Sequence, residues 1–262
     1  MKRTVTKMNV KELYKYLNEK IPTTLSCDWD NDGLMCAPNA AREVNRVLIA
    51  LDITGEAVKE AINGNYDLVI SHHPLIFKGI KSVTEDSYIS SKLIELIKAD
   101  ISAMSFHTRL DAVAGGVNDI LAEKLGVKNA LPFGIDATPI GRIGTLDAPM
   151  SLSDFAESVK RALGAPCVSY ADAGKQAYRI ALLGGAGEDD IAAAVFAGAD
   201  TYVSGELGYH RLTDAPDGEI NLIEAGHFYT EFPVCERIAE LVRAADRDIV
   251  CDIFNSDRTK VI

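Results

Sequence analysis

Short, uninterrupted apolar runs alternate along this chain with segments of helical spacing. Arg46–Asp52 (RVLIALD) and Tyr66–Ser71 are each predicted to be a buried strand, because continuous Val, Ile and Leu suit a strand covered on both faces. Gly55–Ile62, which lies between them, is predicted to be a helix. A strand–helix–strand repeat requires parallel pairing, with helices packed over the sheet. The sequence therefore predicts an α/β fold.

The alternation continues to Gly126 and then begins again. In the first half we further expect a helix from Val10 with Asn9 and Glu12 capping its start, a helix at Ser87–Lys98, a strand at Ile101–Phe106 and a helix at Gly116–Leu125. In the second half we expect strands at Pro139–Leu146, Tyr178–Leu183, Thr201–Ser204, Glu219–Glu224 and Asp248–Phe254, and helices at Ser153–Leu163, Asp189–Phe196 and Tyr229–Ala244. The composition shifts at residues 131–134 (LPFG), which places two α/β domains at 1–130 and 131–262. A discontinuous domain stays open as an alternative.

The composition argues against several classes of partner. The 262 residues carry a formal net charge of −11, whereas a protein that coats nucleic acid or anionic membrane needs a basic face. No apolar run approaches the ~20 residues of a membrane span. The charged start is followed by an amphipathic stretch, which argues against a signal peptide. The five cysteines are odd in number and form no CxxC, so reduced thiols in a cytoplasmic protein are expected.

The chain contains only five histidines, and two of them are adjacent. His72 and His73 follow the predicted strand that ends at Ser71, and ligands gather beyond the carboxyl ends of strands in α/β sheets. Neighbouring strand side chains point to opposite faces, so two ions that each take one histidine fit better than one ion, unless the backbone turns there. The alternative is a pair of polar loop histidines.

Two further histidines precede a carboxylate by four residues. His107 precedes Asp111 just after a predicted strand, and His227 precedes Glu231. Asp111 is a hard ligand that could bridge two ions, and His107 could ligate, orient a ligand or move a proton. In a helix, the spacing of His227 and Glu231 places both on one face. The alternatives are a turn aspartate beside a satisfied histidine, and a surface pair; the three groups nevertheless follow strands in the same way.

Three other features are weaker. Glu206 and His210 have the same spacing and follow another predicted strand, and they either line the pocket or lie on the surface. The run 184–187 (GGAG) is more typical of a tight turn than of a phosphate loop, because Glu188, Asp189 and Asp190 follow it. Trp29 is a large ring in an otherwise polar turn, which is unusual for plain surface and would suit a pocket edge.

Six runs make the resemblance to a known family specific. The chain resembles the dinuclear-metal family named GTP cyclohydrolase 1 type 2 homologues, also called the Nif-three-like proteins, in runs that occur in family order over nearly its whole length. These runs are WDNDGL (29–34), ALDIT (50–54), DLVISHHPLIF (67–77), FHTRLDAVAGGVND (106–119), GADTYVSGEL (198–207) and GHFYTE (226–231).

The resemblance implies two α/β domains of similar topology, a dinuclear metal site in the cleft between them, and a ring-shaped homohexamer. Carried over residue by residue, the metal ligands are His72, His73, Asp111, His227 and Glu231. His107 and His210 match positions near the metals. Some members carry a long insertion between the halves, for which this chain is too short, and many have an aspartate where Glu206 stands.

The donor set itself indicates the chemistry. Imidazoles with carboxylates suit zinc, iron or manganese better than magnesium or calcium. A bridging carboxylate would hold two ions ~3.5–4 Å apart, and five protein ligands leave coordination positions open for water or substrate. A closed structural zinc site would leave none.

We therefore expect a metal-dependent hydrolase with two divalent ions per chain. A bound water with a pKa near ~7 would supply hydroxide, and His107, His210 or Glu206 would pass the proton. The small-molecule substrate would be a nucleotide, a pterin-like ring or a phosphate ester. The alternative is a hexameric metal-binding scaffold or metal-handling protein without turnover.

Overall fold

The computed structural model describes residues 7–260 and 262. The chain divides into two compact units. Unit 1 comprises the described residues through Leu110 together with Cys235–Asp257, and unit 2 comprises Asp111–Val234 and the described part of Arg258–Ile262. Both contain a sheet and helices, which confirms the α/β class. The domain boundary expected near residue 130 stays a prediction; the 131–134 run lies at the end of strand β5 and in the turn that follows.

Unit 1 is built on a five-stranded sheet with the order β1-β4-β3-β2-β11. Its strands are β1 (Gly33–Cys36), β2 (Arg46–Ala50), β3 (Leu68–Ser71), β4 (Ser102–Ser105) and β11 (Val250–Phe254). Its helices are α1 (Val10–Lys20), the 3₁₀ turn η1 (Thr23–Leu25), α2 (Gly55–Asn63), α3 (Tyr88–Lys98) and α10 (Val234–Ala245), while α4 (Thr108–Ala112) crosses the boundary between the units. The strands β2, β3, β4 and β11 are parallel, and β1 is an antiparallel edge.

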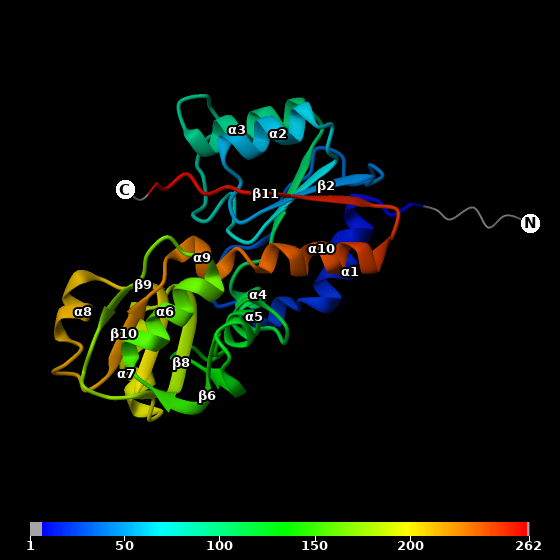
Figure 1. Cartoon of the computed structure of the whole chain (residues 1–262). Helices are drawn as coiled ribbons and strands as arrows, with labels where there is room; N and C mark the ends of the chain where they lie inside the picture. The colour runs from blue at the N-terminus through cyan, green and yellow to red at the C-terminus, as the bar shows by residue number, and fades with distance from the viewer. Residues whose placement is uncertain (1–6, 261) are drawn as a thin grey trace, which may run out of the picture. The chain divides into compact units, whose positions relative to one another are not determined.

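Helices cover both faces of this sheet. In Figure 1, α2 and α3 lie over one face, and α1 and α10 lie over the other. The side chains of Leu48 and Val69 pack in one core with Val58 of α2 and Leu93 of α3. Burial on both faces explains why these strands are continuous apolar runs in the sequence.

Unit 2 is built on a six-stranded mixed sheet with the order β5-β6-β8-β9-β10-β7. Its strands are β5 (Lys128–Phe133), β6 (Gly141–Met150), β7 (Ser169–Ala171), β8 (Ala177–Ala186), β9 (Thr201–Glu206) and β10 (Asn221–Glu224). Its helices are α5 (Val117–Lys124), α6 (Leu152–Leu163), the 3₁₀ turn η2 (Glu188–Asp190), α7 (Ile191–Phe196), α8 (Tyr209–Asp214) and α9 (His227–Glu231). The strands β8, β9 and β10 are parallel, and the other pairings are antiparallel.

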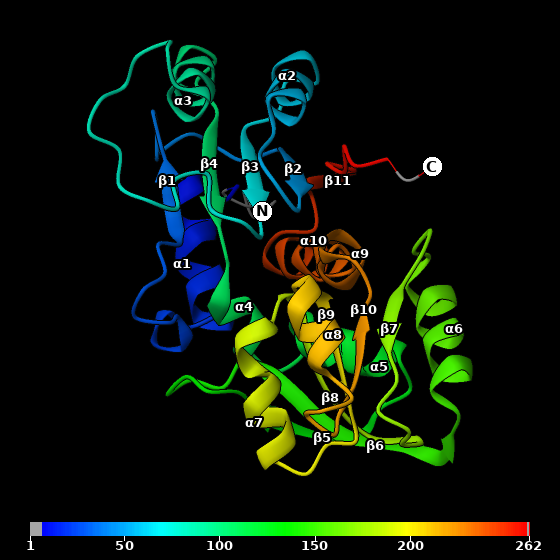
Figure 2. The same cartoon turned by 90° about the vertical axis from the view of Figure 1, so that its left-hand side faces the viewer.

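The two faces of this sheet have separate cores. Leu182 and Val203 pack with residues of α5 and α6, whereas their chain neighbours Leu183 and Tyr202 pack on the other face with Ala194 of α7. The same elements can be followed in Figure 2. Alternation along β8 and β9 thus sends successive apolar side chains to opposite, covered faces.

Two expectations about individual elements are wrong. The long helix expected at 229–244 is two helices, α9 and α10, with Pro233 between them. Proline has no N–H to donate and its ring clashes with the preceding turn, so the helix is interrupted there. The glycine run 184–187 is not a turn after a strand, because β8 continues to Ala186 with an irregular register against β9 after Leu183. Gly185 has a φ of +69°, which allows this irregularity.

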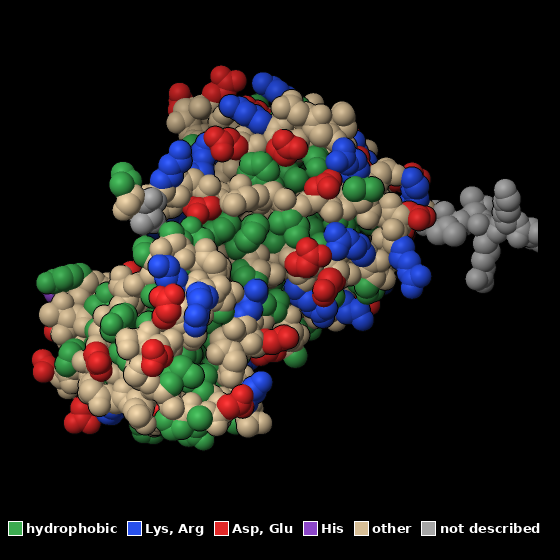
Figure 3. Space-filling view, viewed as in Figure 1, with side chains coloured by type: hydrophobic (Ala, Val, Ile, Leu, Met, Phe, Trp, Pro, Cys, Tyr) green, Lys and Arg blue, Asp and Glu red, His purple; other side chains and the backbone are tan. Residues whose placement is uncertain are grey.

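Within the described residues, no helix combines the length and the apolar character that crossing a bilayer requires. On the face shown in Figure 3, acidic and basic side chains are interspersed.

Candidate metal centre

Three neighbouring parallel strands of unit 1 end beside residues that can bind or orient a metal. Asp52 follows β2, His72 and His73 follow β3, and His107 follows β4. Because these strands are adjacent and parallel, their carboxyl ends meet at one edge of the sheet. One ring nitrogen from each of the three histidines lies within 4.8 Å of those of the other two.

His72 and His73 do not point to opposite sides. The strand β3 ends at Ser71, so both histidines lie beyond the pleated backbone. Their ring centroids are 4.9 Å apart, and those of His72 and His107 are 5.2 Å apart. The argument from strand alternation therefore does not apply, and one ion could contact both rings.

Each of the three imidazoles is oriented through Nδ1. His72 Nδ1 lies 2.9 Å from the Phe106 carbonyl oxygen, His73 Nδ1 lies 2.8 Å from Asp52 Oδ1, and His107 Nδ1 lies 2.8 Å from Asp30 Oδ1. A carbonyl oxygen can only accept, so Nδ1 of His72 carries the proton and Nε2 carries the lone pair. Metal-binding histidines are commonly held in this way by an acceptor on the other nitrogen.

The loop that contains Asp30 and Asp32 supports His107 from two sides. The buried carboxylate of Asp30 also accepts hydrogen bonds from the Thr108 backbone N–H (3.0 Å) and hydroxyl (2.6 Å). Burial raises the pKa of Asp30, but the hydrogen bonds from His107 and Thr108 outweigh it and lower the pKa to about 2. Asp32 Oδ2 accepts from the His107 N–H (3.0 Å) and from Arg109 Nε (2.8 Å).

The sequence reasoning did not identify Asp30, Asp32 or Asp52 as functional residues. All three lie in two of the family-like runs, 29–34 and 50–54, which is the signal that could have drawn attention to them. Their partners are distant in sequence, since 77 positions separate Asp30 from His107. Pattern and spacing alone could not pair them.

Unit 2 carries a second group of imidazole and carboxylate at the ends of its parallel strands. The helix α9 begins at His227, after β10 and Gly226, and His227 Nε2 lies 3.0 Å from Glu231 Oε2. His227 Nδ1 lies 3.1 Å from Oε1 of Glu206, the last residue of β9. Glu231 is buried, whereas Glu206 is exposed.

The backbone around this pair is crowded. At Gly185, an added Cβ would meet Glu231 Oε1 at 2.2 Å and His227 Nε2 at 3.1 Å. The Thr230 hydroxyl accepts the Gly185 N–H (3.1 Å) and can donate to the His227 carbonyl (2.8 Å), which joins β8 to α9. A side chain at Gly185 would have to displace the Glu231 carboxylate and would lie at a φ of +69°, so both effects favour glycine where β8 passes the carboxylate.

The remaining expected residues lie in different settings. Asp111 is buried in α4. His210 is exposed in α8, with its ring centroid 5.4 Å from that of Tyr209, and the groups of described residues that could hold a metal do not include it. Because β9 ends at Glu206 and α8 begins at Tyr209, the four-residue spacing of Glu206 and His210 is not the spacing of a helix pair.

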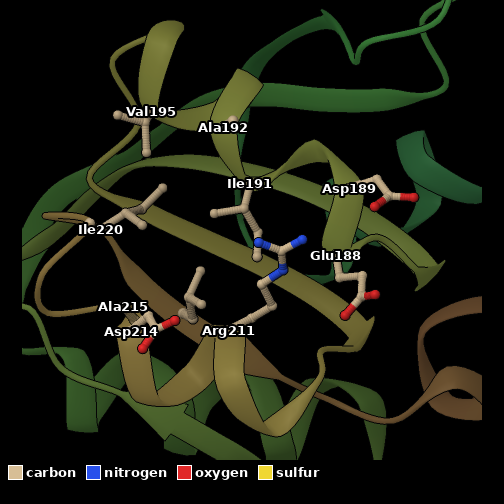
Figure 4. Close-up of a pocket in the computed structure, with 11 residues that line it drawn as sticks. Glu188, Asp189, Ile191, Ala192, Val195, Arg211, Asp214, Ala215 and Ile220 are labelled. Atoms are coloured by element: carbon tan, nitrogen blue, oxygen red, sulfur yellow. The ribbon is translucent and has the colours of Figure 1, made fainter.

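A cavity of about 430 Å³ lies elsewhere in unit 2, between α7 and α8. Figure 4 shows the Arg211 side chain extending into it beside Ile191, with Glu188 and Asp214 at its rim. Its lining contains neither an imidazole nor a thiol. The side chains of Glu206, His227 and Glu231 therefore do not line this cavity.

The donor chemistry of the histidine cluster fits a transition-metal site. Three imidazoles converge, and an oxygen acceptor orients each of them. Such nitrogen donors suit zinc or iron, whereas magnesium and calcium prefer oxygen ligands. The residues present thus fit the metal that the sequence predicts.

Comparison with known proteins identifies the family to which the chain belongs. The profile of the family Duf34/NIF3 (NGG1p interacting factor 3) matches residues 8–260. A GTP cyclohydrolase 1 type 2 homolog of Clostridium perfringens is 33% identical over 243 residues, covering 90% of this chain and 92% of that protein. The alignment with a homolog of the same name from Staphylococcus aureus runs over 364 positions, so that relative carries inserted residues that this 262-residue chain lacks.

Solved structures give the same result. The crystal structure of Staphylococcus aureus protein SA1388 has a TM-score of 0.86 and 30% identity, covering 97% of this chain and 99% of that one. Reduced HcgD from Methanocaldococcus jannaschii has a TM-score of 0.83 and 28% identity, with coverage of 97% and 99%. On the match over nearly its full length, the chain belongs to the Duf34/NIF3 family.

Proposed function

We propose that this chain binds two divalent metal ions and uses them to hydrolyse a small-molecule substrate. The observation that carries the proposal is the convergence of His72, His73 and His107, each with Nδ1 held by an oxygen acceptor. The proposed ions are zinc, iron or manganese. The proposed ligands, drawn from both units, are His72, His73, Asp111, His227 and Glu231.

The residues have distinct parts in such a reaction. A divalent ion, when bound, supplies Lewis acidity and lowers the pKa of a water molecule to about 7. The Phe106 carbonyl and Asp52 fix the ring planes of His72 and His73, so the imidazoles need no reorganisation. His107, His210 and Glu206 are the proposed proton-transfer groups. Glu206 has the clearest structural support, because its exposed carboxylate lies 3.1 Å from His227.

The names of the relatives are compatible with this reaction class. Several are called GTP cyclohydrolase 1 type 2 homolog, and a cyclohydrolase is a hydrolytic enzyme. The substrate of this chain is proposed to be a nucleotide, a pterin-like ring or a phosphate ester. A homohexamer and a cytoplasmic location also stay predictions; analytical ultracentrifugation checks the first.

Elemental analysis of metal-replete protein tests the binding. We expect two ions per chain in the wild type, and loss of metal in His72→Ala and in the nearly isosteric Glu231→Gln. If ligands of both units act on the same ions, the double variant should lose little more metal than the stronger single variant, because additivity fails for residues that share a partner. One ion or none in the wild type, together with unchanged binding in His72→Ala, would contradict the proposal.

An activity screen with the same preparations tests the hydrolysis. The exposed His210 belongs to none of the groups of described residues that could hold a metal, so His210→Ala should keep its metal. Turnover should fall in this variant if the His210 side chain moves a proton. A metal-replete wild type without turnover on nucleotide, pterin and phosphate-ester substrates would instead support a metal-handling protein.

A further inference from the structure

Two exposed aromatic rings stand beside the histidine cluster of unit 1. Trp29 is 55% exposed and Phe77 is 43% exposed. Their ring centroids are 6.2 Å apart, and those of Trp29 and Phe77 are 6.2 Å and 6.0 Å from that of His107. In all three pairs the rings meet edge to face, with interplanar angles of 75–87°. We call Trp29 and Phe77 the aromatic pair.

The segment that carries Trp29 is held on both sides. Before it, the Cys27 N–H donates to the Thr108 hydroxyl (2.9 Å). After it, the buried Asp30 accepts from His107 and Thr108. The backbone that carries the indole is therefore held in part by the contact that orients His107.

The segments that carry Trp29 and Phe77 are also joined by a hydrogen bond. The side-chain amide of Asn31, two residues after Trp29, donates to the carbonyl of Ile76, which directly precedes Phe77 (2.5 Å). Exposed apolar side chains lose little conformational entropy on binding a ligand when hydrogen bonds already hold their backbone in place. Tyr88 at the start of α3 is also exposed, but its ring lies against the Lys92 ammonium group rather than beside an imidazole.

We propose that the aromatic pair is the binding site for a flat, purine-sized heteroaromatic ring of the substrate, which stacks there beside the histidine cluster. In proteins that bind single-stranded nucleic acids, each base that stacks on an aromatic side chain contributes about 1–3 kcal/mol, whichever base it is. A saturated phosphate ester has no group that would use the aromatic pair. The binding of the ring depends on unit 1 alone, and its role as part of a substrate depends on the proposed function.

The chain offers a direct readout, because Trp29 is its only tryptophan. Intrinsic tryptophan fluorescence therefore reports on this site and on no other. We would titrate the protein with adenosine, with ribose and with choline, using N-acetyltryptophanamide to correct for absorption and collisional quenching. Adenosine should quench saturably. Ribose should not quench, because it has no aromatic face. Choline should not quench either, and saturable quenching by choline would instead indicate a simple cation–π site.

Variants make the assignment specific. Phe77→Leu should weaken adenosine binding roughly tenfold, which corresponds to about 1.4 kcal/mol. Tyr88→Leu, which alters an exposed ring of the same unit, should leave adenosine binding unchanged. Trp29→Leu, followed by calorimetry, should weaken binding as well, whereas Trp29→Phe should retain most of it. Thermal unfolding of each variant confirms that it is folded.

The titration distinguishes this proposal from the metal proposal. Adenosine should bind both metal-free and metal-loaded protein, and Trp29→Leu and Phe77→Leu should keep the metal content of the wild type. Failure to bind metal would overturn the proposed function and leave ring binding intact. The ring proposal is overturned if adenosine gives no saturable quenching, if choline or ribose quenches equally, or if Phe77→Leu and Tyr88→Leu behave alike.

Discussion

An imidazole binds a metal through one nitrogen, and the group that holds the other nitrogen decides which one. In unit 1 the acceptors are a backbone carbonyl and two carboxylates, all on Nδ1. In unit 2, His227 lies between the carboxylates of Glu206 and Glu231. The chemistry of each of these four histidines therefore depends on a residue that is distant in sequence as well as on the ring itself.

Gly185 permits a test at the scale of one residue. Gly185→Ala adds a methyl group at 2.2 Å from Glu231 Oε1 and at a φ of +69°. We expect the free energy of unfolding to fall by about 2–4 kcal/mol, because a positive φ and a steric overlap both oppose the side chain. Urea denaturation measures this change.

Gly174→Ala is the matched control. Gly174 has a φ of +75°, but nothing lies within 4 Å of its added Cβ. In this variant the free energy of unfolding should fall only by the contribution of the positive φ, about 1 kcal/mol. Equal losses in the two variants would mean that the contact with Glu231 is unimportant.

Parallel strands place the ends of several elements at one edge, and separate contacts fix where the strands begin. The carboxylate of Asp67, just before β3, accepts from the N–H groups of Asn45 (2.7 Å) and Arg46 (3.0 Å) at the start of β2. Arg42 Nε also donates to it (2.9 Å). These bonds align β2 with β3, and thereby the residues at their far ends.

The stability supplied by Asp67 should depend on pH. Burial raises its pKa, but the bonds from Asn45, Arg46 and Arg42 outweigh burial, and the pKa is lowered. A depressed folded-state pKa gives stability that is present above the unfolded-state value of about 3.9 and is lost as pH falls through the folded-state value. Asp67→Asn should therefore destabilise the protein at pH 7 by roughly 1–3 kcal/mol.

Denaturant unfolding between pH 7 and acidic conditions checks this expectation. The difference between wild type and Asp67→Asn should shrink as pH falls below about 4. Asp217→Asn, in an exposed turn of unit 2, should be neutral at both ends of the range. A difference that stays constant with pH would show that the charge of Asp67 is not the cause.

Each of the two units has its own sheet and its own core, and unit 1 is discontinuous. After unit 2 the chain returns through α10 to add β11 beside β2. The helix α10, whose Ile238 and Val242 are buried, also belongs to unit 1. Unit 1 therefore cannot be completed until the C-terminal segment has been made.

Metal removal should change the stability of the whole chain. A ligand that binds only the folded state stabilises it by about 2.7 kcal/mol at a free concentration one hundred times its Kd. Calorimetry of metal-replete and chelator-treated protein should therefore show a lower Tm after chelation. His72→Ala should show a smaller difference, and an equal difference in both proteins would place the metal elsewhere.

Local patterns predicted a large part of the fold. The capping of α1 by Asn9 and Glu12, the apolar runs of β2 and β3, and the left-handed Gly126 after α5 are all confirmed. The strands β1, β5 and β7 escaped prediction because they are short antiparallel edge strands of three to six residues. The break at Pro233 was readable in the sequence and was missed.

Periodicity and residue type determine the α/β class and the set of potential metal donors, because both depend on neighbours within a few positions. Only the tertiary structure decides that His72 and His73 lie on the same side and that Asp30 holds His107. It also decides that Trp29 lies beside both Phe77 and His107. These arrangements join residues that are distant along the chain, and their geometry depends on how strand ends meet in space.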